Sequence, residues 1–149
     1  MNEVSAKEAK AVQISPHLMF DGQCRDAFSA YQKILGGNMT TLLTYGESPM
    51  AAQVDRQWHD RIVHATLDLG SVELTGADVL PQDYRKPQGF FVTLSVEGKA
   101  RAAEIFEALA EGGEIRLAFQ STFWSPGFGV LVDKYGIPWE INCAGENAS

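Results

Sequence analysis

Long apolar runs are missing from this chain of 149 residues. No segment approaches the ~20 consecutive apolar residues that a helix needs to span a bilayer, so we do not expect a membrane protein. The first segment, residues 1–13, is rich in Ala, Lys and Glu and lacks an apolar stretch of signal-peptide length. We therefore interpret it as a terminal tail and expect a cytoplasmic protein.

Basic residues are scarce as well. Lys and Arg number 12 against 19 Asp and Glu, which gives a net charge of -7. A nucleic-acid partner normally requires a basic face, and an anionic membrane surface attracts basic segments. The charge balance therefore argues against both kinds of partner.

Cysteine motifs and phosphate-binding loops are also absent. The two cysteines, Cys24 and Cys143, lie far apart without CxxC or Cys/His spacing, so neither a zinc module nor a disulfide framework is expected. The chain has no Gly-x-x-x-x-Gly-Lys-Ser/Thr run, and its glycine pairs follow apolar helical segments instead of opening them. A nucleotide-dependent function is therefore unsupported, and we expect no organic cofactor.

What the sequence does contain is one order of elements used twice. With 45% hydrophobic and 21% charged residues, the chain suits one compact domain. Apolar residues with period two predict strands, those with helical spacing predict helices, and a Gly-Gly pair follows each helix. The predicted elements are a strand at 14–20, a helix at 24–35, strands at 39–45, 62–69 and 71–77, then a strand at 89–96, a helix at 100–112 and strands at 114–122, 127–133 and 137–143.

This order is βαβββ twice. In such a repeat, two half-units that each have one apolar face must bury it jointly. We therefore predict one domain, with tails at both ends. Its parts are a tail at 1–13, the domain at 14–143 with module one at 14–80, a linker at 81–87 and module two at 88–143, and a tail at 144–149.

Glu140 is the one charged residue of the last predicted strand. Alternation places it on the face opposite Trp139 and Ile141, which we expect to face the core. The Glu140 side chain then either meets solvent on an open sheet or lines a cavity, and both interpretations stay open.

Two further polar residues, His64 and Glu73, share a face of the hairpin that precedes the linker. We predict that they point with Glu140 into one concave cavity that has Trp124 at its rim. The apolar positions of these strands are expected to pack under the helices: Val63, Leu67, Leu74 and Trp139.

Six segments of the chain resemble one known family, in the same order. They are Phe20-Asp21-Gly22-Gln23-Cys24, Tyr31, Leu35-Gly36-Gly37, Ile62-Val63-His64-Ala65, Gln120-Ser121-Thr122-Phe123-Trp124 and Gly136-Ile137-Pro138-Trp139-Glu140-Ile141-Asn142. With the tandem βαβββ pattern, they resemble the PhnB-like branch of the vicinal oxygen chelate superfamily, which includes glyoxalase I, extradiol dioxygenases and bleomycin-resistance proteins. Members of this branch often carry the name 3-demethylubiquinone-9 3-methyltransferase. The resemblance covers residues 14–143.

The resemblance implies an α+β fold. Its tandem βαβββ modules would form a curved, partly open eight-stranded sheet or barrel, with the helices on the convex face. It also implies a homodimer, because the apolar faces of the modules in this superfamily often meet across a two-fold axis.

Proteins of this superfamily hold a divalent metal ion with histidines from the first strands of the modules and glutamates from the last strands. Residue by residue, the glutamate places correspond to Glu140 and, within one residue of register, Glu73. The histidine places fall near Pro16 and Phe91, neither of which can bind a metal. His17 adjoins Pro16 but is expected on the opposite face.

His64 would have to complete such a metal site from the third predicted strand. The resemblance therefore leaves two interpretations. In the first, Glu140, Glu73 and His64 hold a divalent ion such as Zn, Mn, Ni, Fe or Co. In the second, His64 is a pocket residue hydrogen-bonded to a neighbour, and no metal binds.

The aromatic residues Phe91, Phe123 and Trp124 are expected to line the pocket, with the core or a seam between two copies as the alternatives. We favour a metal-free protein that binds a small molecule, for instance a cation, in an acidic, aromatic-lined cavity. The alternatives are a divalent-metal-dependent enzyme of the glyoxalase or dioxygenase type, and a dimeric scaffold with a vestigial site. Methyl transfer lacks support, because no Gly-rich turn connects a first strand to a helix.

Overall fold

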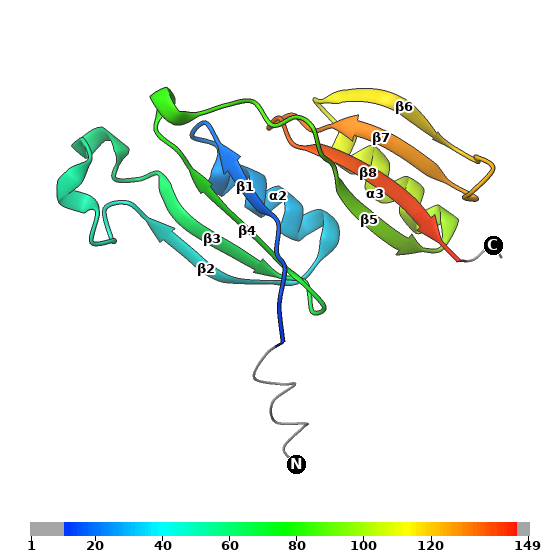
Figure 1. Ribbon diagram of the computed structural model, residues 1–149, viewed down its shortest axis with the longest axis horizontal. Coiled ribbons are helices and arrows are strands. Elements are labelled where there is room, and N and C mark those ends of the chain that lie inside the picture. The colour runs from blue at the N-terminus through cyan, green and yellow to red at the C-terminus, as the bar shows by residue number, and fades with distance from the viewer. Residues whose placement is uncertain (1–10, 146–149) are drawn as a thin grey trace, which may run out of the picture.

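Two consecutive modules of the same order, βαβββ, make up the chain (Figure 1). The computed structural model describes residues 11–145, so most of the two expected tails lies outside the described residues. Module one contains β1 (His17–Phe20), α2 (Cys24–Leu35), β2 (Asn38–Thr44), β3 (Ile62–Asp68) and β4 (Glu73–Asp78). Module two contains β5 (Val92–Glu97), α3 (Lys99–Ala110), β6 (Glu114–Gln120), β7 (Phe128–Val132) and β8 (Pro138–Ala144).

The eight strands are divided between two four-stranded sheets, so the predicted α+β fold with tandem modules is confirmed. Sheet one has the order β1-β4-β3-β2, and sheet two has the order β5-β8-β7-β6. In each sheet the first and last strands of the module pair in parallel, and the other pairs are antiparallel. The parallel pair of each sheet therefore sets which residues from the two ends of a module lie side by side.

The connections between these strands carry three short 3-10 helices. Two of them, η1 (Ala51–Gln53) and η2 (Arg56–Trp58), lie in the long segment between β2 and β3, and η3 (Pro81–Asp83) follows β4. Within residues 11–145, neither α2 nor α3 has the length and apolar character to cross a bilayer.

Each α-helix packs on one face of its own sheet, and the helices also contact each other. Glycine permits this close packing: a Cβ at Gly76 on β4 would lie 2.6 Å from the ring of Phe28, and a Cβ at Gly129 on β7 would lie 2.5 Å from the ring of Phe106. Because each helix takes one face, the opposite face of each sheet has no helix on it in the described part of the chain (Figure 1).

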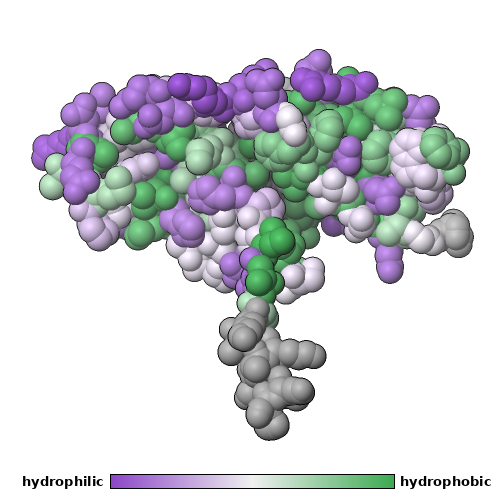
Figure 2. Space-filling view, in the orientation of Figure 1, coloured by the Kyte–Doolittle hydropathy of each residue, from purple (hydrophilic) through white to green (hydrophobic). Residues whose placement is uncertain are grey.

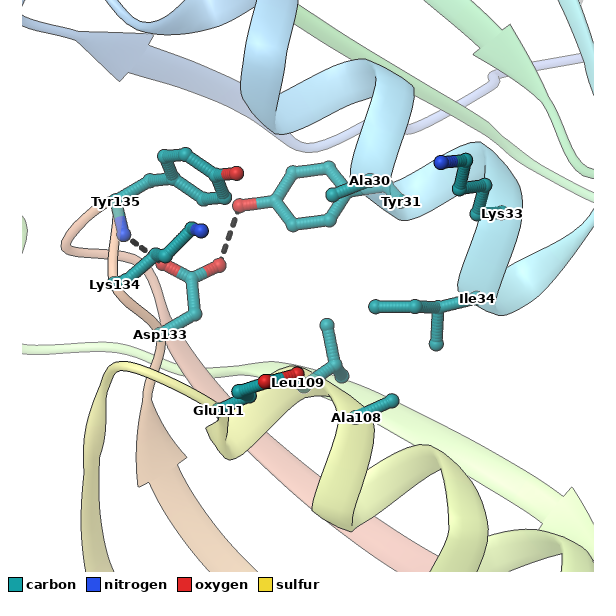
Figure 3. Close-up of a pocket in the computed structure, with 10 residues that line it drawn as sticks. All are labelled: Ala30, Tyr31, Lys33, Ile34, Ala108, Leu109, Glu111, Asp133, Lys134 and Tyr135. Carbon is teal, nitrogen blue, oxygen red and sulfur yellow. Dashed lines mark hydrogen bonds between the residues drawn. The ribbon is translucent and has the colours of Figure 1, made fainter.

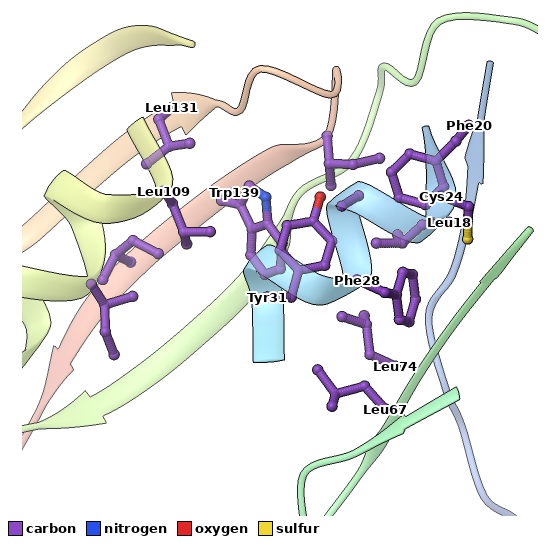
Figure 4. Packing of buried hydrophobic residues seen from close by; sticks show 14 of the residues in the cluster. Leu18, Phe20, Cys24, Phe28, Tyr31, Leu67, Leu74, Leu109, Leu131 and Trp139 are labelled. Atoms are coloured by element: carbon purple, nitrogen blue, oxygen red, sulfur yellow. The ribbon is translucent and has the colours of Figure 1, made fainter. Parts of the chain in front are cut away.

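One apolar core runs through both modules under the helices. Tyr31 of α2 and Trp139 of β8 meet near its middle, with ring centroids 5.3 Å apart (Figure 4). The prediction that Leu67, Leu74 and Trp139 are buried is confirmed. These contacts join the two modules as parts of a single domain.

Val63 was expected in the core beside those residues, and that prediction is wrong. Val63 is only half-buried, whereas its neighbour Ile62 is fully buried. The pairing of β2 with β3 shifts register between Leu43 and Thr44, opposite the start of β3. This irregularity breaks the strict alternation on which the expectation rested.

Candidate functional site

The uncovered face of sheet two, here called open face two, carries Glu140. Its residues are Thr93, Ser95, Phe128, Val130, Glu140 and Asn142, placed by the pairing of β8 with β5 and β7. The Thr93 hydroxyl donates a hydrogen bond of 3.1 Å to Glu140 Oε1. On the same side of β8, Asn142 Oδ1 is buried and accepts no hydrogen bond within the described residues. The face therefore gathers oxygen acceptors that a ligand with N–H or O–H groups could satisfy.

An aromatic wall adjoins these acceptors. Phe128 lies directly opposite Asn142, and the ring of Trp124 lies 5.2 Å from that of Phe128. The Phe123 ring lies 4.7 Å from that of Trp124 but is 97% exposed, whereas Trp124 is 55% exposed. Of the three predicted aromatic residues, Trp124 thus stands beside open face two, and Phe123 projects into solvent.

Hydrogen bonds hold the turn that carries these aromatic rings. The Thr122 hydroxyl oxygen accepts from the backbone N–H groups of Trp124 (3.3 Å) and Ser125 (3.1 Å). The Ser125 hydroxyl donates to the carbonyl of Gly127 at 2.7 Å. An exposed aromatic pair is thereby presented in a fixed position, which suits a contact surface.

The uncovered face of sheet one, open face one, carries two histidines. Its residues are His17, Met19, His64, Thr66 and Thr75. His17 Nδ1 lies 2.7 Å from the Thr75 hydroxyl, His64 Nε2 lies 3.3 Å from the Thr66 hydroxyl, and the two imidazole centroids are 6.0 Å apart. Partial burial and the adjacent His64 hold the pKa of His17 below its ordinary value of 6.5.

The expectation that His17 points away from the pocket face is therefore wrong. Leu18 and Phe20 are buried under α2, so alternation along β1 turns His17 and Met19 to the open side. The expectation had used Pro16 as the reference position. The sequence carries no signal for the parallel pairing of β1 with β4, which places His17 beside Thr75 on the open face.

A third part of the site is a cavity of about 370 Å³ in the crease between the two sheets, here called the crease cavity. It forms where the chain leading into β1 runs beside the start of β5, and Figure 2 shows apolar side chains gathered in the middle of the molecule. Its lining residues include Glu73, Phe91, Thr93 and Trp139. Thr93 thus joins the crease cavity to Glu140 on open face two.

The predicted site residues consequently fall into three places. Glu140 and Trp124 belong to open face two, His64 to open face one, and Phe91 to the crease cavity, whereas Glu73, which alternates with Thr75 on β4, lies on open face one and also lines the crease cavity. Between residues 11 and 145, no three His, Cys, Asp or Glu side chains lie close enough to hold a metal ion. One chain therefore does not bring Glu140, Glu73 and His64 together, because Glu140 stands on sheet two, whereas His64 and Glu73 stand at different heights on sheet one.

The register also shows which residues lie opposite each other in the two parallel strand pairs. His17 on β1 lies opposite Thr75 on β4, and Thr93 on β5 lies opposite Glu140 on β8. His17 and Glu140 are the strong metal ligands of these two pairs, so a metal site that takes the usual three ligands from the protein would also need His64 of open face one.

A smaller cavity, of about 200 Å³, lies on the helical side between α2 and the end of α3 (Figure 3). At its base, Asp133 accepts hydrogen bonds from the Tyr31 hydroxyl (2.5 Å) and from Trp139 Nε1 (2.9 Å). The backbone N–H groups of Tyr135 and Ile137 donate to its other oxygen. With four donors, the carboxylate is fully engaged, and we regard this cluster as structural.

The arrangement of two βαβββ modules with one open face per sheet defines a protein of the vicinal oxygen chelate fold. A glyoxalase-related enzyme from Fulvimarina pelagi shares this fold, with a TM-score of 0.62, 15% identity and coverage of 93% of this chain and 94% of that one. A PhnB protein from Bacillus cereus does so with a TM-score of 0.76, 24% identity and coverage of 89% and 100%.

The family itself follows from closer similarity. A family model described as 3-demethylubiquinone-9 3-methyltransferase matches residues 12–142. Protein YjdN of Escherichia coli (strain K12) is 34% identical over 137 residues, which are 87% of this chain and 93% of YjdN. Protein PA1353 from Pseudomonas aeruginosa is 40% identical, with a TM-score of 0.82 and coverage of 89% and 98%. The chain belongs to this family, the PhnB-like branch of the vicinal oxygen chelate superfamily.

Proposed function

We propose that the protein is a homodimer that binds a small molecule between the open faces of two copies, in an acidic and aromatic-lined site without a resident metal ion. One observation carries the proposal. Each sheet presents one hydrogen-bonded polar pair, His17 with Thr75 and Thr93 with Glu140, on a face that no helix of the described chain covers.

The placement of the open faces supports a homodimer. The two sheets lie side by side, each with one open face (Figure 1). A second copy related by a two-fold axis can set its open face two against open face one of the first, and the same contact then forms twice. Met19 and Trp124, both about half-exposed in one chain, supply apolar surface for that contact.

The chemistry of open face two favours a cationic ligand with hydrogen-bond donors. Glu140 supplies negative charge, and the unpaired Asn142 Oδ1 on the same face supplies a further acceptor. Trp124 and Phe128 supply aromatic faces, which attract cations. A small amine or quaternary ammonium compound with a polar arm satisfies all three features.

A metal-dependent enzyme of the glyoxalase or dioxygenase type is the second candidate. It is favoured by the closeness of His17 and His64, since two imidazoles and one carboxylate from a facing copy would suffice for a non-haem iron type of centre. Elemental analysis of protein purified without an affinity tag decides between the candidates. A stoichiometric divalent ion that is lost on Glu140→Gln would establish the second and reject the first.

Methyl transfer, which the family description names, is not part of the proposal. The connection from β1 to α2 is the short turn Asp21-Gly22-Gln23, and the Arg61 side chain fills the space beside Gly22. No glycine-rich phosphate or nucleoside loop is formed there.

Trp124 provides the readout for the ligand experiment, because Trp58 and Trp139 are buried. We expect small quaternary ammonium compounds, with choline as the first probe, to change the tryptophan fluorescence in a saturable way. Glu140→Gln should weaken this binding about tenfold or more, as loss of a charge partner costs more than ~1.4 kcal/mol. Glu107→Gln is the matched control, since Glu107 is an exposed residue of α3, on the helical side of sheet two. Equal binding by both variants would reject the cation site.

A further inference from the structure

The cavity of about 200 Å³ on the helical side, here called the helix cavity, lies on the opposite side of the sheets from the open faces. Its apolar wall comes from both helices: Ala30 and Ile34 of α2, and Ala108 and Leu109 of α3 (Figure 3). An apolar cavity of about 150 Å³ is large enough to hold benzene. The helix cavity therefore has room for one aromatic ring with a short arm, but not for a nucleotide.

Two lysines stand at the mouth of the helix cavity. Lys33 belongs to the last turn of α2, and Lys134 belongs to the turn between β7 and β8. Both also line an open groove of about 540 Å³, which continues over the polar residues Gln23 and Ser29. The two ammonium groups are therefore placed where an apolar cavity meets a polar, solvent-exposed groove.

Neither lysine forms an ion pair within residues 11–145. The ion pairs of this part of the chain join Arg101 to Glu104 and Arg116 to Glu114. The Asp133 carboxylate at the base of the cavity already accepts hydrogen bonds from four other donors. The two ammonium groups therefore leave a local positive charge on a chain whose net charge is -7.

Packing holds Lys134 beside the cavity. Its stem lies against Gly112, where an added Cβ would be 3.1 Å from Lys134 Cδ. Its Nζ lies 5.4 Å from the centroid of the Tyr135 ring, which also lines the cavity. Glu111, the other carboxylate of the lining, is exposed and pairs with neither lysine in the described chain. An ammonium that is already placed loses less freedom when a ligand binds.

We propose that the helix cavity binds a small organic carboxylate, with its compact apolar body between the helices and its carboxylate group at Lys33 and Lys134. Charge-assisted hydrogen bonds from the ammonium groups hold the carboxylate, and burial of the apolar body supplies the remaining affinity. The inference does not rest on the proposed function, because its residues lie on the other side of the sheets from Glu140 and Trp124.

Phenylacetate is the first probe, since it joins one ring to a carboxylate. We expect saturable heat when it is titrated into the full chain, and a rise in the midpoint of thermal unfolding, because a ligand of the folded state stabilises it. Phenylacetamide has the same shape without the charge and should bind about tenfold or more weakly. Equal binding of the two compounds would overturn the inference.

The double variant Lys33→Gln/Lys134→Gln tests the charge from the side of the protein. It should bind phenylacetate about tenfold or more weakly, since both ammonium groups are lost. Lys86→Gln/Lys99→Gln is the matched control, because it removes the same charge at two exposed positions outside the cavity. The control should bind phenylacetate as the unchanged protein does.

Ala108→Trp tests the location. Ala108 is exposed and lines the cavity, so an indole ring there fills the space without a change in the core. Ala100→Trp is the control, since Ala100 is exposed near the start of the same helix. Ala108→Trp should lose phenylacetate binding, whereas its binding of choline, measured by calorimetry, should be unchanged. The two sites can therefore fail separately.

Loss of binding in the double lysine variant and in Ala108→Trp, with both controls unchanged, supports the inference. No saturable binding of phenylacetate to the unchanged protein at millimolar concentration overturns it, as does binding that persists in Ala108→Trp. If circular dichroism shows that the double lysine variant does not fold, Ala108→Trp and the comparison of phenylacetate with phenylacetamide give the decision.

Discussion

Tyr31 and Asp133 are joined by a 2.5 Å hydrogen bond across the boundary between the two modules. Tyr31 belongs to α2 of module one, and Asp133 belongs to the β7–β8 turn of module two. Both side chains are buried, and Trp139 donates to the same carboxylate oxygen. This bond fixes how the two sheets, and hence the two open faces, are set relative to each other.

Tyr31→Phe should lower the free energy of unfolding by about 1–3 kcal/mol, because a buried hydrogen bond to a charged group is lost. Tyr135→Phe is the control, since Tyr135 binds Asp133 through its backbone N–H, which the substitution keeps. Urea denaturation measures both. Equal stability of the two variants would contradict the role assigned to the Tyr31 hydroxyl.

Alkaline pH should act through the same bond. Burial and the Asp133 carboxylate raise the pKa of Tyr31 well above its ordinary value of 10.0. The stabilisation is therefore fully present below pH 10 and is lost as the pH rises through the pKa of the folded state. The fall in stability above pH 10 should be smaller in Tyr31→Phe, as followed by denaturation at pH 9 and at higher pH.

Asp78→Asn should destabilise module one by about 1–3 kcal/mol. The Asp78 carboxylate is buried and accepts from the backbone N–H groups of Cys24 and Ile62, one on each oxygen. Asparagine keeps one acceptor and sets an NH₂ group against a backbone donor. Asp83→Asn, at an exposed position, is the control. Thermal unfolding measures the stability of both variants, and equal stability would contradict the role assigned to Asp78.

The pKa of His17 should rise toward 6.5 in His64→Gln. Burial and the charge of His64 both lower it, and the substitution removes the second cause. The Thr75 hydroxyl, which lies 2.7 Å from His17 Nδ1, is unchanged. Titration of the ring resonances by NMR measures the shift, and an unchanged pKa would show that burial alone is responsible.

The sign of the accompanying stability effect follows from linkage. Because the pKa of folded His17 lies below 6.5, the unfolded chain binds the proton more readily, and stability decreases as the pH falls below 6.5 through the folded value. This loss should be smaller in His17→Asn, measured by denaturation at pH 7.5 and at pH 5.

Phe123→Ser should weaken dimerisation and leave the stability of the monomer within about 0.5 kcal/mol, since the side chain is almost fully exposed in one chain. Sedimentation velocity over a range of concentrations gives the association constant. A monomer at micromolar concentration in the unchanged protein would reject the dimer itself, and equal association of both proteins would remove Phe123 from the contact.

The order of elements could be predicted from the sequence because periodicity and glycine are local signals. The helix at 24–35 is predicted to the residue, since the Ala27, Phe28 and Tyr31 spacing is helical and Gly36 takes a positive φ of 86° at its end. The position of Glu140 on the face opposite Trp139 also follows from simple alternation.

The site could be predicted only in part, because it depends on register between distant strands. Counting along the chain could not show that parallel pairing sets Thr75 beside His17 and Thr93 beside Glu140. The N-terminus of α2 has no side-chain cap from its own N-cap residue, and the distant Asp78 binds the N–H of Cys24 instead. Such contacts between residues far apart in sequence leave no local pattern to read.

The parallel pairing of the first and last strands of each module also affects how the chain folds during synthesis. His17 meets Thr75 across 58 positions, and Thr93 meets Glu140 across 47. During synthesis, β1 cannot pair until β4 has emerged, so each module closes only when its final strand is complete. Module one can then close while module two is still being translated, and β5 stays an unpaired edge until the last residues of the domain arrive.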